Sequence, residues 1–277
     1  MERLADLHIH TTASDGALSP SLIVRAAADA GLAAIAITDH DTVDGIDEAL
    51  AAGREMGVEI VPGVEISAVY GHNVEVHMLG YYIDQHQPAF VSKLRFLCEA
   101  RTERGLRIVE KLNAAGVPIS FERVMEIAGD GAVGRPHVAK ALCEMGVASC
   151  LDAAFGKYLV EGTPGFVARH KVSPSEAVAM IVEAGGVPCC AHVAKLNREE
   201  LLIELMREGM RAIEVDHPDH GPAGAKYYRK FAMKHGLIPT GGSDAHCHVG
   251  GRSPGVGGVT APYEVVELIR QAAGMEA

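Results

Sequence analysis

The 277-residue sequence lacks the cysteine spacings of zinc knuckles and disulfide frameworks, because none of its six cysteines stands in a CxxC motif and two are adjacent. It also lacks an apolar run that approaches the ~20 residues of a membrane span. No basic region followed by an apolar stretch and a small-residue cleavage site opens the chain, so no secretory signal is readable. We therefore expect a cytoplasmic globular protein with free thiols, no membrane contact and no evident protein partner.

Positive charge is scarce as well. Lysine and arginine total 25 against 36 aspartates and glutamates, which gives a formal net charge of −11 at pH 7. Binding of long polyanions depends on many basic side chains, so a general nucleic-acid-binding surface is not indicated, whereas a small phosphorylated substrate remains compatible. A chain of this length can bury one large core.

The opening stretch ADLHIHTTASDG, residues 5–16, carries the first sign of chemistry. His8 and His10 stand two apart in a short apolar run that is typical of a strand. Alternate strand residues point to one face, so both imidazoles should project together. A histidine pair alone is more often an ordinary polar pair than a metal site. Asp15 and the histidine and carboxylate clusters further along the chain favour the metal site.

Strand and helix patterns alternate along most of the chain, as in parallel βαβ units. Ser19 and Pro20 predict a helix start and Gly31 its end, and a strand over 33–37 follows. The alternation is interrupted by two successive strands, over 58–67 and 73–83, and then by a helix-rich stretch over 87–165. The stretch is expected to hold helices over 88–115, 120–128, 135–145 and 150–160. The alternation returns with strands near 187–192, 211–216, 237–241 and 257–260.

Histidines and carboxylates gather where the expected strands end, which is the edge where parallel α/β folds build their sites. Imidazole and carboxylate without thiolate suit manganese, zinc or iron. One zinc-like site uses three or four ligands, so nine candidates imply two or three divalent ions, with a carboxylate such as Glu65 bridging. These candidate ligands are His8, His10, Asp15, His40, Glu65, His77, His192, Asp244 and His246.

Clustered ions of this kind can activate water and stabilise both oxygens of a displacement at phosphorus, although attack on a carbonyl or amide stays open. The segment GAVGRPHVAKAL adds an anion-binding signal, with Pro136 expected as the first helical residue. Arg135 and His137 would then flank a helix amino terminus, which favours phosphate, or be ordinary surface residues. His217 follows a strand end and is a candidate substrate ligand or general acid.

The motifs ADLHIHTTASDG, AITDHDT, PGVEIS, GRPHVA and GGSDAH, in this order, resemble the PHP (polymerase and histidinol phosphatase) family. The resemblance implies an α/β fold, a distorted seven-stranded (β/α) barrel formed by residues 1–98 and 166–277, with an α-helical insertion over 99–165. It also implies a trinuclear centre, often manganese, and phosphate contacts from Arg135 and His137. By motif position the first ion would bind His8, His10, Glu65 and Asp244, the second Glu65, His77 and His192, and the third Asp15, His40 and His246.

Within this family the chain most resembles stand-alone phosphoesterases that remove the 3′-phosphate of nucleoside 3′,5′-bisphosphates, such as the adenosine compound, whose product is AMP. Arg135, His137 and His217 would orient the phosphates. Three alternatives stay open: a 5′-to-3′ exoribonuclease that acts on short 5′-phosphorylated RNA ends, a phosphatase for another small molecule such as histidinol phosphate, and a non-catalytic metal-stabilised module.

Overall fold

The computed structural model describes residues 3–275 apart from 73, 130–132, 169–171 and 248–253. One sheet curls into a nearly closed barrel with the strand order β7-β6-β5-β4-β3-β2-β1-β8. The strands are β1 (Leu4–Ile9), β2 (Ala34–Ile37), β3 (Glu59–Tyr70), β4 (Val74–Tyr81), β5 (Val187–Cys190), β6 (Ala212–Asp216), β7 (Ile238–Gly241) and β8 (Ala261–Pro262). Seven strands carry the barrel as expected, and the eighth is a two-residue strand beside the start of β1.

Four of the seven neighbouring pairs in this sheet run parallel, whereas β4 lies antiparallel to both β3 and β5, and β8 lies antiparallel to β1. The two successive strands that broke the βα rhythm in the sequence therefore form a hairpin. The barrel closes where the chain after β7 meets β1, because the His10 N–H donates to the Ala245 carbonyl at 3.0 Å. A methyl group at Gly242 would lie 2.4 Å from Cβ of His8, so this closure requires glycine.

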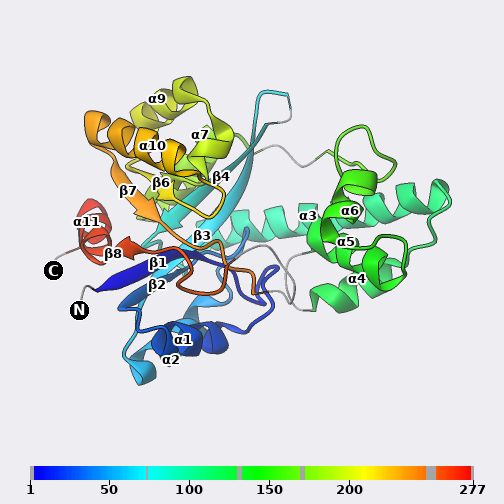
Figure 1. Cartoon of the computed structure of the whole chain (residues 1–277), viewed down its shortest axis with the longest axis horizontal. Helices are drawn as coiled ribbons and strands as arrows, with labels where there is room; N and C mark the ends of the chain where they lie inside the picture. The colour runs from blue at the N-terminus through cyan, green and yellow to red at the C-terminus, as the bar shows by residue number, and fades with distance from the viewer. Residues whose placement is uncertain (1–2, 73, 130–132, 169–171, 248–253, 276–277) are drawn as a thin grey trace.

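Helices cover the outside of the barrel, with α1 and α2 on one side and α7, α9 and α10 on the other (Figure 1). Ser19 caps α1 and Pro20 is its first residue, as the sequence predicts, and Ser173 forms a capping box with Glu176 at the start of α7. The barrel helices are α1 (Pro20–Asp29), α2 (Ile46–Met56), α7 (Pro174–Glu183), α8 (Val193–Leu196), α9 (Glu199–Glu208), α10 (Pro222–His235) and α11 (Glu264–Ala272).

The stretch that the sequence predicts to be helical is helical, and it projects from the barrel (Figure 1). The 150–160 segment is not one regular helix, because its second half winds as a π-helix. The elements here are α3 (Pro88–Ala114), α4 (Phe121–Ala128), α5 (Arg135–Glu144), α6 (Leu151–Ala154) and the π-helix η1 (Phe155–Leu159).

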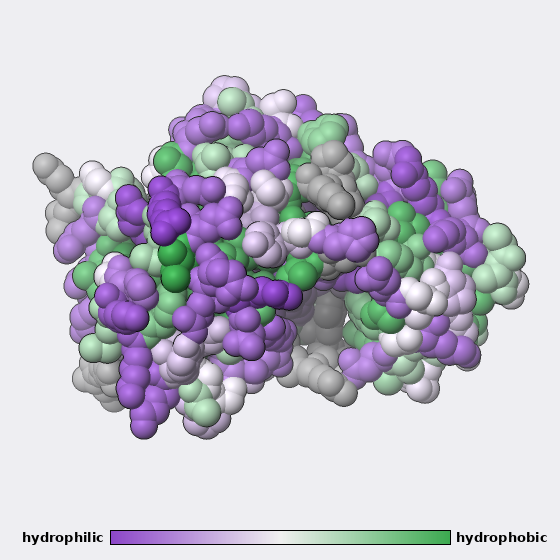
Figure 2. Space-filling model, turned by 90° about the horizontal axis from the view of Figure 1, so that it is seen from above, coloured by the Kyte–Doolittle hydropathy of each residue, from purple (hydrophilic) through white to green (hydrophobic). Residues whose placement is uncertain are grey.

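Helix α3 belongs to two apolar cores. Phe90, Leu94 and Leu97 in its first half pack into the core between the barrel and its helices. Ile108 and Leu112 in its second half pack into a separate core formed by the insertion helices. The helix therefore fixes the insertion beside the barrel, and the space-filling surface is indented between the two parts (Figure 2). The predicted boundary between residues 98 and 99 falls inside α3 and stays a prediction.

No helix among the described residues is long and apolar enough to cross a membrane.

Candidate metal centre

The nine candidate ligands come together at one end of the barrel. The pairing of β2 with β3 continues past Ile37, because the Asp41 N–H donates to the Glu65 carbonyl and the Glu65 N–H to that of Asp39. This extension places His40 opposite Glu65. Glu65 and His77 lie inside β3 and β4 rather than beyond their ends, because both strands of the hairpin are long.

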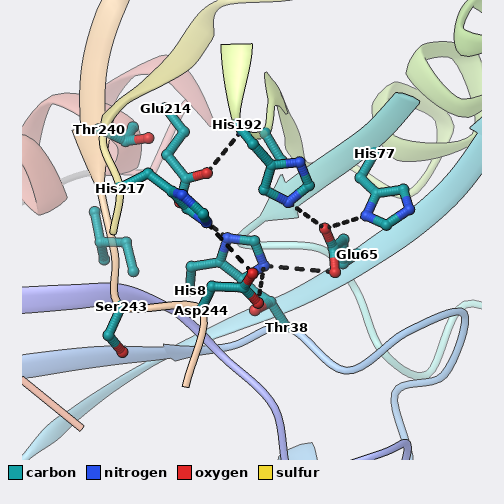
Figure 3. Close-up of polar contacts among 12 residues, drawn as sticks. His8, Thr38, Glu65, His77, His192, Glu214, His217, Thr240, Ser243 and Asp244 are labelled. Carbon is teal, nitrogen blue, oxygen red and sulfur yellow. Dashed lines mark hydrogen bonds and ion pairs between the residues drawn. The ribbon is translucent and has the colours of Figure 1, made fainter. Parts of the chain in front are cut away.

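Glu65 is the hub of the cluster, and its side chain is 1% exposed. Its carboxylate lies between imidazoles that come from four different strands or the loops after them, and Figure 3 shows three of them, His8, His77 and His192, converging on it. The Glu65 Oε1 atom lies 2.8 Å from His77 Nδ1 and 3.2 Å from His192 Nε2. The Oε2 atom lies 3.0 Å from His40 Nδ1, 3.2 Å from His10 Nε2 and 3.4 Å from His8 Nε2.

Asp244 and Asp15 flank this hub. Asp244 Oδ1 lies 3.2 Å from His10 Nε2 and 3.5 Å from His8 Nε2, and Asp15 Oδ1 lies 3.3 Å from His246 Nε2. Ligand atoms of His10, Asp15, His40 and His246 all lie within 4.8 Å of one another, as do those of His8, His10 and Glu65.

Backbone strain accompanies this arrangement. His192 and Asp244 are non-glycine residues in the left-handed region, with φ of 41° and 50°. Such conformations cost of order 1–3 kcal/mol and cluster at functional sites. The strain turns both side chains toward the hub from the ends of β5 and β7.

The residues fit divalent ions. Four buried atoms in the centre make no hydrogen bond although polar neighbours crowd them: His10 Nδ1, His40 Nδ1, Glu65 Oε2 and His77 Nε2. Burial lowers the pKa of His40 to about 4, which keeps this imidazole in the neutral form that binds metal. Burial opposes ionisation of Glu65, but the imidazoles of His40, His77 and His8 outweigh it and hold its pKa well below the usual range. An ionised carboxylate together with imidazoles, which bind a metal once they have lost their extra proton, is a donor set for manganese, zinc or iron.

The sequence interpretation missed Glu214, which is fully buried on β6. Its Oε1 accepts a hydrogen bond from His8 Nδ1 at 2.9 Å, and its Oε2 accepts one from the His192 N–H at 2.8 Å. The centre thus contains a carboxylate that orients two candidate ligands from behind. A glutamate between Ile213 and Val215 in an apolar strand is a signal that could have found it.

Two further carboxylates fix the loops that carry ligands. Asp39 accepts hydrogen bonds from the Thr11 N–H and hydroxyl, both at 2.7 Å, and from the Ser14 hydroxyl at 2.6 Å. These bonds shape the loop that ends at Asp15. Asp6 accepts bonds from the backbone N–H and hydroxyl of Ser243, which precedes Asp244.

The phosphate candidates divide between two places. Arg135 lines a cleft together with Arg101, Arg104, His40 and His77, which we call the arginine cleft. Its guanidinium contacts both carboxylate oxygens of Glu75 at 2.9 Å. Helix α5 begins at Arg135, as the helix predicted over 135–145 does, and Pro136 is its second residue rather than its first.

His137 lines a different cavity, beside Thr12 and Lys140. Its Nδ1 accepts the Gly134 N–H at 3.0 Å, so it caps α5.

His217 lies at the metal centre. Its Nε2 is 3.3 Å from Asp244 Oδ2, and its Nδ1 accepts the Asp219 N–H at 3.1 Å. Because Nδ1 accepts, the neutral ring carries its proton on Nε2 and donates it to Asp244.

The sequence and the fold of this chain have counterparts among known proteins. The PHP domain matches residues 6–128. The chain is 34% identical to the 3′,5′-nucleoside bisphosphate phosphatase of Chromobacterium violaceum over 91% of its own length and 88% of the relative's. It is also 34% identical to the 5′-3′ exoribonuclease Rnm of Escherichia coli, over 87% of this chain and 84% of that one.

A solved structure from Bifidobacterium adolescentis, described as that of a putative metal-dependent phosphoesterase, superposes with a TM-score of 0.90 at 32% identity, covering 97% of this chain and 96% of the other. The barrel, the helical insertion and the ligand cluster thus occur in a chain whose similarity to known proteins runs over almost its whole length. The protein therefore belongs to the PHP domain family.

Proposed function

We propose that this protein is a metal-dependent phosphoesterase that removes the 3′-phosphate of nucleoside 3′,5′-bisphosphates and releases the 5′-monophosphate. The observation that carries the proposal is the arginine cleft, in which Arg101, Arg104 and Arg135 face His40 and His77 of the centre. A substrate with two phosphates needs one phosphoryl group at the ions and a separate cationic grip for the other. Guanidinium groups match phosphate oxygens in pairs, which lysine cannot do.

Two or three divalent ions, proposed to be manganese, would activate water and neutralise charge on the phosphoryl oxygens. The first would bind His8, His10, Glu65 and Asp244, the second Glu65, His77 and His192, and the third Asp15, His40 and His246. The chain's own residues orient the reaction. Arg135 exchanges its Glu75 contact for the second phosphate, and His217, whose Nε2 proton rests on Asp244, offers a proton at the edge of the centre.

We propose a more limited part in phosphate binding for His137 than for Arg135. Its imidazole is 6% exposed and its Nδ1 is used by the Gly134 N–H. We propose that it supports phosphate binding by fixing the first turn of α5, which presents Arg135.

The proposal is tested by comparing turnover of adenosine 3′,5′-bisphosphate with that of a 5′-phosphorylated dinucleotide, each with manganese, zinc or iron added to metal-free protein. We expect inorganic phosphate and AMP from the bisphosphate at the higher kcat/KM, with manganese most active. Preferred cleavage of the dinucleotide would instead assign the exoribonuclease activity of the Escherichia coli relative. Full metal occupancy without hydrolysis of any phosphoester, histidinol phosphate included, would leave a non-catalytic module.

A further inference from the structure

The arginine cleft has two chemically different parts. Charged groups from the barrel, α3 and α5 line one part, and these include metal-ligand candidates as well as arginines. The other part is apolar and comes from the insertion, where Ile108, Val133, Pro136 and Phe155 meet. A nucleotide is divided in the same way, into charged phosphates and a flat base with apolar faces.

Phe155 is the one phenylalanine, tyrosine or tryptophan among the described residues that line this cleft. It is the first residue of the π-helix η1, directly after α6, and π-helical turns are frequent at functional sites. Its ring is only partly buried and packs at the edge of the insertion core, which holds it in place. Because the ring is already held in place at the border of the cleft, little side-chain conformational entropy is lost when a ligand stacks on it.

The ring already carries a flat group. The guanidinium carbon of Arg135 lies 5.6 Å from the centre of the Phe155 ring while the same guanidinium binds Glu75. A phosphate in the cleft would draw Arg135 to its oxygens, because a guanidinium binds phosphate through two parallel hydrogen bonds. The face of the ring is then available to another flat group, and nucleobases stack on aromatic side chains.

We infer that Phe155 is the stacking platform for the nucleobase of the substrate, and hence the residue by which this protein selects nucleotides over other phosphate esters. This inference deepens the proposed function and rests on it. It gives a reason for the insertion, since the barrel supplies the metal ligands and the insertion supplies the surface that recognises the base.

A second cavity with an aromatic side chain is the natural competitor. Phe121 lines it together with Ala13, Thr42 and Cys98, and none of the nine candidate ligands borders it. A nucleotide whose base lay in that cavity would not place a phosphate at the metal centre. Phe121 also packs partly buried against the same insertion core as Phe155, so it provides a matched control.

The experiment compares kcat/KM for adenosine 3′,5′-bisphosphate with kcat/KM for ribose 3,5-bisphosphate, which has both phosphates and no base. The ratio of the two values measures recognition of the base. We expect Phe155→Leu and Phe155→Met to lower this ratio about five- to 150-fold, the range for loss of one base–aromatic stack, while Phe155→Trp preserves it. Phe121→Leu should leave the ratio at the wild-type value.

Both substrates are measured on the same preparation, so a partly unfolded variant loses activity on both and its ratio does not move. A ratio unchanged in Phe155→Leu and Phe155→Met, or lowered equally in Phe121→Leu, overturns the inference. So does a wild-type protein that hydrolyses both bisphosphates with the same kcat/KM, an outcome that leaves the proposed function intact. Hydrolysis of neither bisphosphate refutes the proposed function and the inference with it.

Discussion

Replacing Glu214 by glutamine should weaken metal binding although Glu214 is not one of the nine candidate ligands. The carboxylate accepts two hydrogen bonds, from His8 Nδ1 and from the His192 N–H. Glutamine offers one acceptor and one NH₂ group at these positions, so one N–H donor must face another donor. If the NH₂ group faces His8, the imidazole moves its proton to Nε2, the atom that points toward Glu65 and Asp244.

The magnitude follows from the fully buried position of the pair, where water cannot replace the lost acceptor. Removing such an orienting partner typically lowers metal affinity 10- to 100-fold, which is about 1.4–2.7 kcal/mol. The assay is titration of metal-free protein with Mn²⁺, with the free ion counted by electron paramagnetic resonance. Manganese affinity of Glu214→Gln within twofold of wild type would refute the orienting role.

Glu59→Gln is the matched control, because Glu59 is also a hydrogen-bonded carboxylate of the sheet. It accepts bonds from the Tyr82 and Tyr263 hydroxyls and pairs with Arg270, and it lies at the start of β3. We expect this variant to lose stability without losing manganese affinity. Equal loss of affinity in both variants would show that general destabilisation, and not the orientation of His8, is responsible.

Three further predictions concern charges. The guanidinium of Arg101 lies 3.0 Å from the carboxylate of Asp41, which is 2% exposed, so Arg101→Met leaves a buried carboxylate without its cation. The free energy of unfolding in urea should fall by about 3–5 kcal/mol, and adding Asp41→Asn should largely restore it. A fall of less than about 1 kcal/mol would contradict this prediction. Arg135→Lys should lower kcat/KM for the bisphosphate about tenfold, because lysine lacks the paired donors. An unchanged kcat/KM in steady-state kinetics would contradict this prediction. His8→Ala and Asp15→Ala should each abolish turnover but deplete different ions in elemental analysis, and loss of one and the same ion would refute the proposed ligand sets.

Local patterns in the sequence were sufficient to predict the βα units and the gathering of the nine candidate ligands, whereas the barrel was predicted from the resemblance to the PHP family. Each of these residues lies on a strand or in the loop that follows one, and strands of a barrel meet at common ends, so position in the chain largely determines position in space. The His8 and His10 pair needs only the two-residue period of a strand. Their Nε2 atoms lie 3.2 Å apart in the structure.

Residues that act across the fold could not be predicted in this way. Arg101 and Arg104 resemble ordinary charges of a long helix, and only the packing of α3 between two cores brings them to the cleft. Glu214 on β6 meets His8 on β1, and these two strands do not pair in the sheet, so no local period encodes the contact. The π-helical turn at Phe155 has no local signal in the sequence, since the same residues would also fit an α-helix.

The continuity of α3 has a consequence for dissecting this protein. At 1.5 Å per residue its 27 residues form a rod of about 40 Å, half of which completes each hydrophobic core. A cut between residues 98 and 99 would leave Phe90, Leu94 and Leu97 with the barrel and Ile108 and Leu112 with the insertion, so each fragment would keep the half-helix that packs into its own core. What the cut removes is the rigid connection between the two cores. A chimera that exchanges the insertion between relatives should therefore join outside α3, so that the rod passes unbroken from one core into the other.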